Sequence, residues 1–325
     1  MLNRRQFSVG LAGSASLVFA STARSADKFP SKPIKIIFPG APGSGVEAVI
    51  RSIAEKVSVR LGQPVIIENR PGGNSQIGVA YVAKSPPDGY TLGVGFVTNL
   101  SLAQHTFKEV PYNPLKDLAP VALLATNYLA LVARPDAPFS SVSEMSRWAK
   151  AAPNGLNVGS TSIGGLPHLA FEQLVRSAAI PFTVVSYNSS PGLLQDLIGS
   201  RLDVGMLDFS SARQMADSGK LRLLGITNPA RDPRYPQVPA LSESVKGYEA
   251  LGWFGLVAAA GTPQPVIDTL NEAVVAAIPQ PDVQAAMATF ALVPAGGSPQ
   301  VFAAWLQSED QKFAALVKQI GFKPQ

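Results

Sequence analysis

The sequence predicts an α/β protein of two lobes, each a doubly wound, mostly parallel sheet flanked by helices, with a cleft between the lobes. First, an apolar strand pattern at 34–38 leads through a Pro/Gly loop into a helical pattern that starts near residue 46. Second, this alternation occurs twice, over about 34–126 and about 127–250. Third, 46% of the residues are hydrophobic and 15% charged, which is typical of a chain with a substantial core.

The first half alternates short strands and helices. Gly62 is a helix stop signal, so the first helix ends there. The remaining elements expected in this half are a strand at 64–68, a Gly loop at 69–74, a helix at 76–84, a turn at 85–89, a strand at 90–97 and a long apolar run at 118–133 that is broken at Asn127.

The second half repeats the pattern. A Gly/Ser loop at 159–165 follows a strand that begins near 157, and Pro167 suits the first turn of the next helix. The other expected elements are helices at 143–150, 169–177, 193–198 and 212–218, strands at 182–186, 202–207, 221–227 and 252–259, and two closing helices at 265–278 and 299–319. We therefore expect lobe 1 to comprise 27–126 plus 251–325 and lobe 2 to comprise 127–250, with hinges near 125–128 and 248–252.

The first 25 residues have the pattern of an export signal. Arg4-Arg5 followed by Phe7 resembles the twin-arginine motif, and a short, weakly apolar stretch follows it. Small residues at Ala23 and Ser25 permit cleavage after Ser25, and cleavage after Ala23 is also possible. With no cysteine for lipid attachment, we expect a protein free in the periplasm and exported by the twin-arginine route.

Composition excludes several classes of function. The formal charge is +5, but removing the leader leaves 24 basic and 22 acidic residues, so nucleic-acid binding is not expected. The chain has no cysteine, and its two histidines, His105 and His168, are 63 positions apart with no carboxylate suitably spaced. We therefore expect no metal site, no cofactor and no thiol chemistry.

Both halves place a Gly-rich loop directly before a helix. The first N–H groups of a helix have no partner within it, and the helix dipole favours negative charge there. A cleft with such helix starts on both sides suits a small anion.

Several segments, in order along the chain, carry a family resemblance. They are Pro33–Pro39 with Ala41-Pro42-Gly43, Leu61–Pro64, Glu68–Gly73, Lys84–Thr91, Gly159-Ser160, Pro167–Leu169, Leu197–Asp203, Gly219–Arg222 and Gly261–Pro263. With these the chain resembles the Bug-type solute receptors, the extracytoplasmic substrate-binding subunits of tripartite tricarboxylate transporters. The resemblance implies a type II-like periplasmic-binding-protein fold that closes on a small organic carboxylate and delivers it to integral-membrane permease subunits. We expect a monomer that is not an enzyme.

The resemblance also implies a binding site, position by position. The expected ligand-binding residues are Ala41, Pro42, Gly43, Ser44, Glu47, Thr98 and Asn99 from lobe 1, and Ser160, Thr161, Gly164, His168 and Asp208 from lobe 2. Two of them depart from the family, which usually has a second Gly where this chain has Ser44 and an Asp where it has Glu47. We expect these two positions to alter the pocket floor, so the solute is not inferred from relatives.

Motifs of other functional classes overlap the same residues. Gly43-Ser-Gly-Val-Glu-Ala48 with Glu68 matches a dinucleotide fingerprint, but its first Gly lies five positions after the last residue of the strand. No P-loop lysine follows the Gly loop, and residues 159–165 miss the serine-hydrolase elbow. The spacing from the strand therefore counts against the dinucleotide motif, and the P-loop and hydrolase motifs are incomplete.

Two alternatives remain open. Glu47 and Asp208 could act as an acid/base pair of a periplasmic hydrolase or isomerase, although we favour a capping role for Glu47 and a site-ordering role for Asp208. The second alternative is a receptor that presents its closed form to a sensor protein. His168 is expected to cap or contact ligand, Trp253 to lie in the core, and Arg231 and Arg234 to be solvated loop charges.

Overall fold

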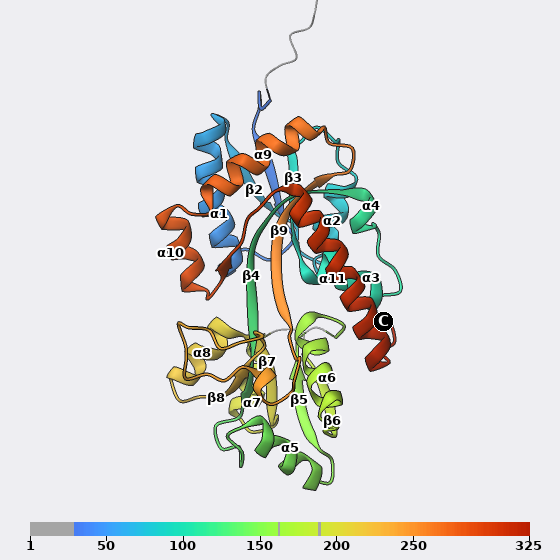
Figure 1. Cartoon of the computed structure of the whole chain (residues 1–325), viewed down its shortest axis with the longest axis vertical. Coiled ribbons are helices and arrows are strands. Elements are labelled where there is room, and N and C mark those ends of the chain that lie inside the picture. The colour runs from blue at the N-terminus through green and yellow to red at the C-terminus, as the bar shows by residue number, and fades with distance from the viewer. Residues whose placement is uncertain (1–28, 162, 188–189) are drawn as a thin grey trace, which may run out of the picture.

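The structure is a computed structural model that describes residues 29–161, 163–187 and 190–325. These residues form two lobes, one above the other in Figure 1, joined by strands β4 (Leu118–Ala133) and β9 (Leu251–Ala259). We call the upper one lobe 1 and the lower one lobe 2. The export signal expected over residues 1–25 lies outside the described residues.

Lobe 1 is built on the strand order β2-β1-β3-β9-β4. Strand β1 pairs in parallel with β2 and β3, whereas β9 runs antiparallel to β3 and β4. The further elements of its sheet are β1 (Ile34–Phe38), β2 (Val65–Asn69), β3 (Thr91–Phe96) and β10 (Val293–Pro294).

Helices cover both faces of this sheet (Figure 1). They are α1 (Gly45–Leu61), α2 (Gln76–Ala83), a π-helix (Thr98–Leu102), α3 (Ala103–Thr106), α4 (Pro114–Asp117), α9 (Gln264–Ala277), α10 (Pro281–Thr289) and α11 (Pro299–Ile320). Helix α11 runs down beside lobe 2, where it packs against α6 (Leu166–Ser177).

Lobe 2 continues the strand order from β4 as β7-β5-β6, with β8 also paired to β4. Strands β5, β6 and β7 are mutually parallel, and β4 is antiparallel to β7 and β8. Its elements are α5 (Val142–Ala151), β5 (Leu156–Ser160), α6, β6 (Phe182–Ser186), α7 (Ser190–Ile198), β7 (Val204–Asp208), α8 (Phe209–Asp217), β8 (Arg222–Ile226) and a 3-10 turn (Leu241–Glu243).

Local chemistry explains where α1 begins and ends. The Ser44 hydroxyl accepts a hydrogen bond from the Glu47 backbone N–H at 3.2 Å, and Gly62 ends the helix in the left-handed conformation at φ +66°. Between these caps, Val49, Ile50 and Ile53 are fully buried. Each such side chain contributes roughly 1.5–3 kcal/mol when it is buried.

Strand β4 belongs to both lobes. It pairs with β9 up to Tyr128, which lies opposite Leu251, and with β7 from Leu129 onward. Asn127, the polar residue that breaks the apolar run, lies within the strand, which passes through it without interruption. A Cβ on Gly252 would lie 2.4 Å from the Asn127 amide oxygen, so this glycine makes room for the asparagine across the strand pair.

The two-lobed α/β fold predicted from the sequence is confirmed, and most elements lie within a few residues of their expected ranges. The sheets are mixed where mostly parallel ones were expected, because β4 and β9 run antiparallel to their neighbours. The elements that were not predicted are helix α10, strand β10, the 3-10 turn over 241–243 and the helical turns over 98–117. Proline at the start of α10 and Asp282 in its first turn are helix-start signals that could have indicated it.

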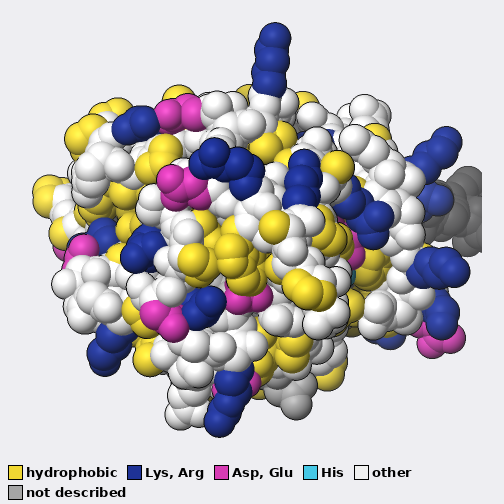
Figure 2. Space-filling view, turned by 90° about the horizontal axis from the view of Figure 1, so that it is seen from below, with side chains coloured by type: hydrophobic (Ala, Val, Ile, Leu, Met, Phe, Trp, Pro, Cys, Tyr) yellow, Lys and Arg dark blue, Asp and Glu magenta, His cyan; other side chains and the backbone are white. Residues whose placement is uncertain are grey.

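The described surface carries mixed charge. Figure 2 looks onto the end of lobe 2, where Lys and Arg side chains lie among apolar and acidic ones. Within the part of the chain that the structure describes, no helix is both long and apolar enough to cross a membrane. The same residues contain no group of three or more metal-ligating side chains.

Candidate functional site

Two adjoining cavities, of about 350 Å³ and about 250 Å³, lie where the lobes meet. Both are lined by Val46 of α1, Asn127 of β4 and Asp208 of β7. The larger is also lined by Ser44, Gly45, Tyr128, Phe209, Ser210, Ser211, Gln214, Phe290 and Leu292. The smaller is also lined by Phe96, Val97, Thr98, Leu129, Leu166, Pro167, Gly252, Trp253 and Phe254.

The start of α1 forms one side of the larger cavity. Ser44, Gly45 and Val46 line it, whereas Ala41 and Pro42 are exposed on the preceding loop and line neither cavity. The Gly43 N–H donates to Glu47 Oε2 at 2.6 Å, so this amide is already occupied within the loop. Gly45 and Val46, which were not among the expected binding residues, place their amides beside the cavity.

Glu47 is turned toward its own loop. The side chain is 2% exposed and lines neither cavity, and its other carboxylate oxygen accepts hydrogen bonds from Arg51. Burial raises the pKa of the Glu47 carboxyl, but hydrogen bonds from Arg51 and Gly43 outweigh it and hold the pKa below its ordinary value. Both oxygens are engaged, which supports the capping role and not the acid/base pair with Asp208.

Asp208 lies at the floor where the cavities meet. Asn127 donates a long hydrogen bond of 3.4 Å from Nδ2 to its Oδ1. The carboxyl is open to solvent through the cleft but otherwise surrounded by protein, and this burial raises its pKa. Asp208 is followed directly by α8, whose first residues Ser210 and Ser211 line the larger cavity.

The Gly/Ser loop of lobe 2 contributes less than expected. Ser160, Thr161 and Gly164 line neither cavity. The Ser160 hydroxyl is 3% exposed and has no hydrogen-bond partner among the described residues. Only the helix after this loop reaches the cleft, through Leu166 and Pro167.

His168 faces a contact between the lobes. Its Nδ1 accepts a hydrogen bond from the Gly164 N–H at 3.1 Å, and its Nε2 lies 3.4 Å from Glu172. The ring packs edge-on against Phe322, which follows α11, with ring centres 5.6 Å apart. The imidazole therefore caps the start of α6 and packs against lobe 1, outside both cavities.

Thr98 and Asn99 have different roles. Thr98 lines the smaller cavity. Asn99 is fully buried, its amide oxygen accepts from the Phe96 N–H at 2.8 Å, and its amide nitrogen donates to the Ser75 carbonyl at 3.3 Å. The Asn99 side chain thus holds the end of β3 in place.

Several lining residues were not identified from the sequence. Three of them, Phe209, Ser210 and Ser211, follow Asp208 directly. The two serines come just after the end of a strand, and this position could have indicated them as site residues. Phe290 and Leu292 come from the far end of the chain, so spacing alone gives no signal for them. Trp253 is buried in the core as expected, and its indole N–H donates to Glu309 at 2.9 Å. It also lines the smaller cavity.

Comparisons with known proteins agree with this geometry. Residues 49–322 match the family described as "Tripartite tricarboxylate transporter family receptor". A "UPF0065 protein in tcbD-tcbE intergenic region" of Pseudomonas sp. (strain P51) is 34% identical over 318 residues, which cover 97% of this chain and 94% of that protein.

Solved structures of other proteins are also similar to this chain in fold and sequence. "R. palustris Rpa4515 with adipate" has a TM-score of 0.82 and 28% identity, and covers 91% of this chain and 100% of its own. "MatC (Rpa3494) from Rhodopseudomonas palustris with bound malate" has a TM-score of 0.77 and 30% identity, and covers 89% and 100%.

Two α/β lobes with cavities at their junction define a solute receptor of the periplasmic-binding-protein class. Within that class, the chain belongs to the tripartite tricarboxylate transporter family of receptors. The family resemblance drawn from the ordered motifs is confirmed.

Proposed function

We propose that this receptor binds one small carboxylate-bearing anion in the two cavities between its lobes and performs no chemistry on it. The observation that carries the proposal is that two helices from opposite lobes start at the larger cavity: Gly45 and Val46 begin α1, and Ser210 and Ser211 lie in the first turn of α8. The first N–H groups of each helix are free to donate to a carboxylate, and such charge-assisted bonds are strong.

Relatives support the ligand class. Adipate and malate, named with two of the similar structures, are both dicarboxylates but differ in length and in hydroxylation. The walls here combine aromatic side chains with a single carboxyl, and no Lys or Arg is among the described lining residues. Backbone amides would therefore hold the anion, and the shape of the walls would select the rest of the solute.

A thermal-shift screen of the mature protein tests this function. Mono-, di- and tricarboxylates, amino acids and aromatic acids would be compared at millimolar concentration. A ligand at 100 times its Kd stabilises the folded state by about 2.7 kcal/mol, which corresponds to a rise of several degrees in Tm. Absence of stabilisation by every carboxylate would overturn the proposal.

The remaining parts of the proposal concern delivery. We infer export by the twin-arginine route, action as a monomer in the periplasm, and transfer of the solute to a membrane permease. Family membership supports the periplasm and the transporter in general. Retention of the precursor in cells that lack the twin-arginine translocase would test the route, and sedimentation would test the monomer.

We propose that the lobes close by bending where strands β4 and β9 pass from one lobe to the other. We infer that lobe 1 comprises 27–126 with 251–325 and that lobe 2 comprises 127–250. The change of partner in β4 after Tyr128, and the start of β9 at Leu251, support hinges at 125–128 and 248–252. If ligand binding leaves hydrogen exchange unchanged both at 125–128 and at 248–252, these hinges are contradicted.

A further inference from the structure

A short segment of lobe 1 reaches into lobe 2 beside the cleft. Phe290, Ala291 and Leu292, here called the linking segment, connect α10 to β10. Phe290 and Leu292 line the larger cavity. Ala291 is buried in the apolar cluster of lobe 2, which contains Tyr128 and Phe209. A ligand in this cavity would therefore touch the linking segment directly.

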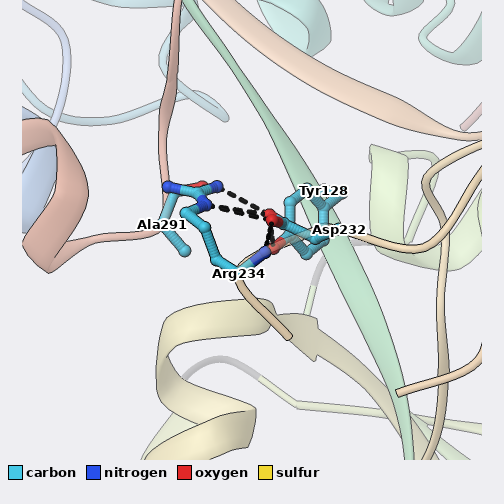
Figure 3. A network of polar contacts seen from close by, with 4 residues as sticks. All are labelled: Tyr128, Asp232, Arg234 and Ala291. Atoms are coloured by element: carbon cyan, nitrogen blue, oxygen red, sulfur yellow. Dashed lines mark hydrogen bonds and ion pairs between the residues drawn. The ribbon is translucent and has the colours of Figure 1, made fainter. Parts of the chain in front are cut away.

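An ion pair of lobe 2, between the buried Asp232 carboxylate and the partly exposed Arg234 guanidinium, holds the backbone of this segment. Figure 3 shows the Arg234 guanidinium between the Asp232 carboxylate and Ala291. Arg234 Nη2 donates to Asp232 at 2.7 Å and to the Ala291 carbonyl at 3.4 Å. Asp232 is 4% exposed and also accepts the Tyr128 hydroxyl at 2.6 Å. Arg234 is exposed, as expected of a loop charge, but it also joins the two lobes near Tyr128, where β4 passes between them.

The other end of the segment presses on the start of α1. A Cβ on Gly45 would lie 2.4 Å from the Phe290 ring, so ring and glycine are in close contact. Across the same cavity stands Phe209, which packs against Tyr128 and Tyr235 with ring centres 4.9 Å and 4.8 Å away. The linking segment thus touches the first helix start of lobe 1 and the aromatic cluster of lobe 2 at once.

We propose that Arg234 is a positioning residue for ligand binding, because it holds the linking segment through the Ala291 carbonyl and so fixes both the Phe290 wall and the angle between the lobes. The inference concerns the same cleft as the proposed function and rests on it for the ligand. The contact between the lobes can be measured without any ligand.

We infer that closure of the cleft shortens and strengthens the bond from Arg234 to the Ala291 carbonyl, which at 3.4 Å is longer than the usual 2.9–3.0 Å. Loss of the bond leaves a smaller fraction of molecules in the binding geometry, and the apparent Kd rises by the inverse of that fraction. One hydrogen bond of this kind corresponds to about a three- to tenfold change in Kd.

The chain supplies a matched control. Arg231 lies three positions away in the same Pro-rich segment and forms two hydrogen bonds of 2.7 Å to Glu243, plus one to the Pro236 carbonyl. All of these partners belong to lobe 2. Arg231→Ala therefore removes an arginine ion pair of the same segment without touching the linking segment.

The first measurement needs no ligand. Because the chain has no cysteine, spin labels can be attached at Val59→Cys on α1 and Ser143→Cys on α5, which are exposed positions on opposite lobes. The distance distribution between the labels should broaden in Arg234→Ala and stay unchanged in Arg231→Ala. Arg234→Lys keeps a charge beside Asp232 and serves as a second variant in case the alanine variant folds poorly; it should broaden the distribution less.

The second measurement is a calorimetric titration with adipate. We expect Kd to rise about three- to tenfold in Arg234→Ala and to stay at the wild-type value in Arg231→Ala. Unchanged distances in both Arg234 variants, or equal effects of the Arg231 and Arg234 substitutions, would overturn the inference. If the wild type binds neither adipate nor any screened carboxylate, the proposed function fails, while the distances still decide the contact between the lobes.

Discussion

At the scale of single residues, the Glu47 carboxylate binds groups of its own loop and helix and lines neither cavity. A longer side chain than the usual aspartate lets it reach back to the Gly43 N–H while Arg51 holds the other oxygen. The loop before α1 is thereby fixed by an internal anion. The amides of Gly45 and Val46, one step further into the helix, line the larger cavity and are the ones proposed to bind the ligand.

Glu47→Gln should therefore destabilise the fold at neutral pH by about 1.5–3 kcal/mol, the range for hydrogen bonds to a charged group. Since the folded-state pKa of Glu47 lies below its ordinary value of 4.5, its ionised form stabilises the native state above that pH. The difference between variant and wild type should shrink as pH falls from 4.5 through the lowered pKa. Urea unfolding at pH 7 and at acid pH measures this.

Glu55→Gln provides the control, because Glu55 is exposed on the same helix. It should change stability little at either pH. A Glu47→Gln penalty that is equally large at both values of pH would show that the charge is not what holds the loop.

At the scale of secondary-structure elements, the start of α1 depends on a segment more than 240 positions away. Helix propensity alone predicts that Gly45→Ala stabilises the protein by up to about 1 kcal/mol. The new methyl group would instead meet the Phe290 ring, and such overpacking costs about 1–3 kcal/mol. We expect the clash to dominate, so the variant should be less stable than the wild type.

A double-mutant cycle checks the cause. In a Phe290→Ala background, Gly45→Ala should become neutral or stabilising, because the ring that blocks the methyl group is gone. Additive effects of the two substitutions would instead assign the loss to the backbone of Gly45.

The same elements show what sequence patterns could and could not predict. Hydrophobic periodicity and the Pro and Gly residues of the loop predicted the strand, loop and helix around Ser44, because each of these signals lies within a few residues. The pairing of Gly252 with Asn127 and of Phe290 with Gly45 depends on contacts between distant segments, which no local pattern contains. Position-by-position transfer from the family placed Ser44, Thr98 and Asp208 at the cavities, but also proposed His168 and Asn99, whose side chains are engaged in packing and capping.

At the scale of the whole molecule, the two lobes share more than their hinge. Strand β4 is hydrogen-bonded in both, and α11 of lobe 1 packs on α6 of lobe 2 on one side of the strands (Figure 1). On the other side the linking segment contacts Arg234. One apolar cluster contains residues of both lobes, such as Leu169 and Phe313.

These shared contacts predict that the lobes unfold together. Trp148 lies on α5 of lobe 2 and Trp305 on α11 of lobe 1, so variants that keep only one of them report on one lobe each. Both variants lack Trp253 and share whatever that substitution costs. In urea, fluorescence and far-UV circular dichroism should give the same midpoint within each variant, as expected for a single cooperative transition. If Trp148 reports an earlier midpoint than circular dichroism while Trp305 does not, lobe 2 unfolds first and β4 does not couple the lobes.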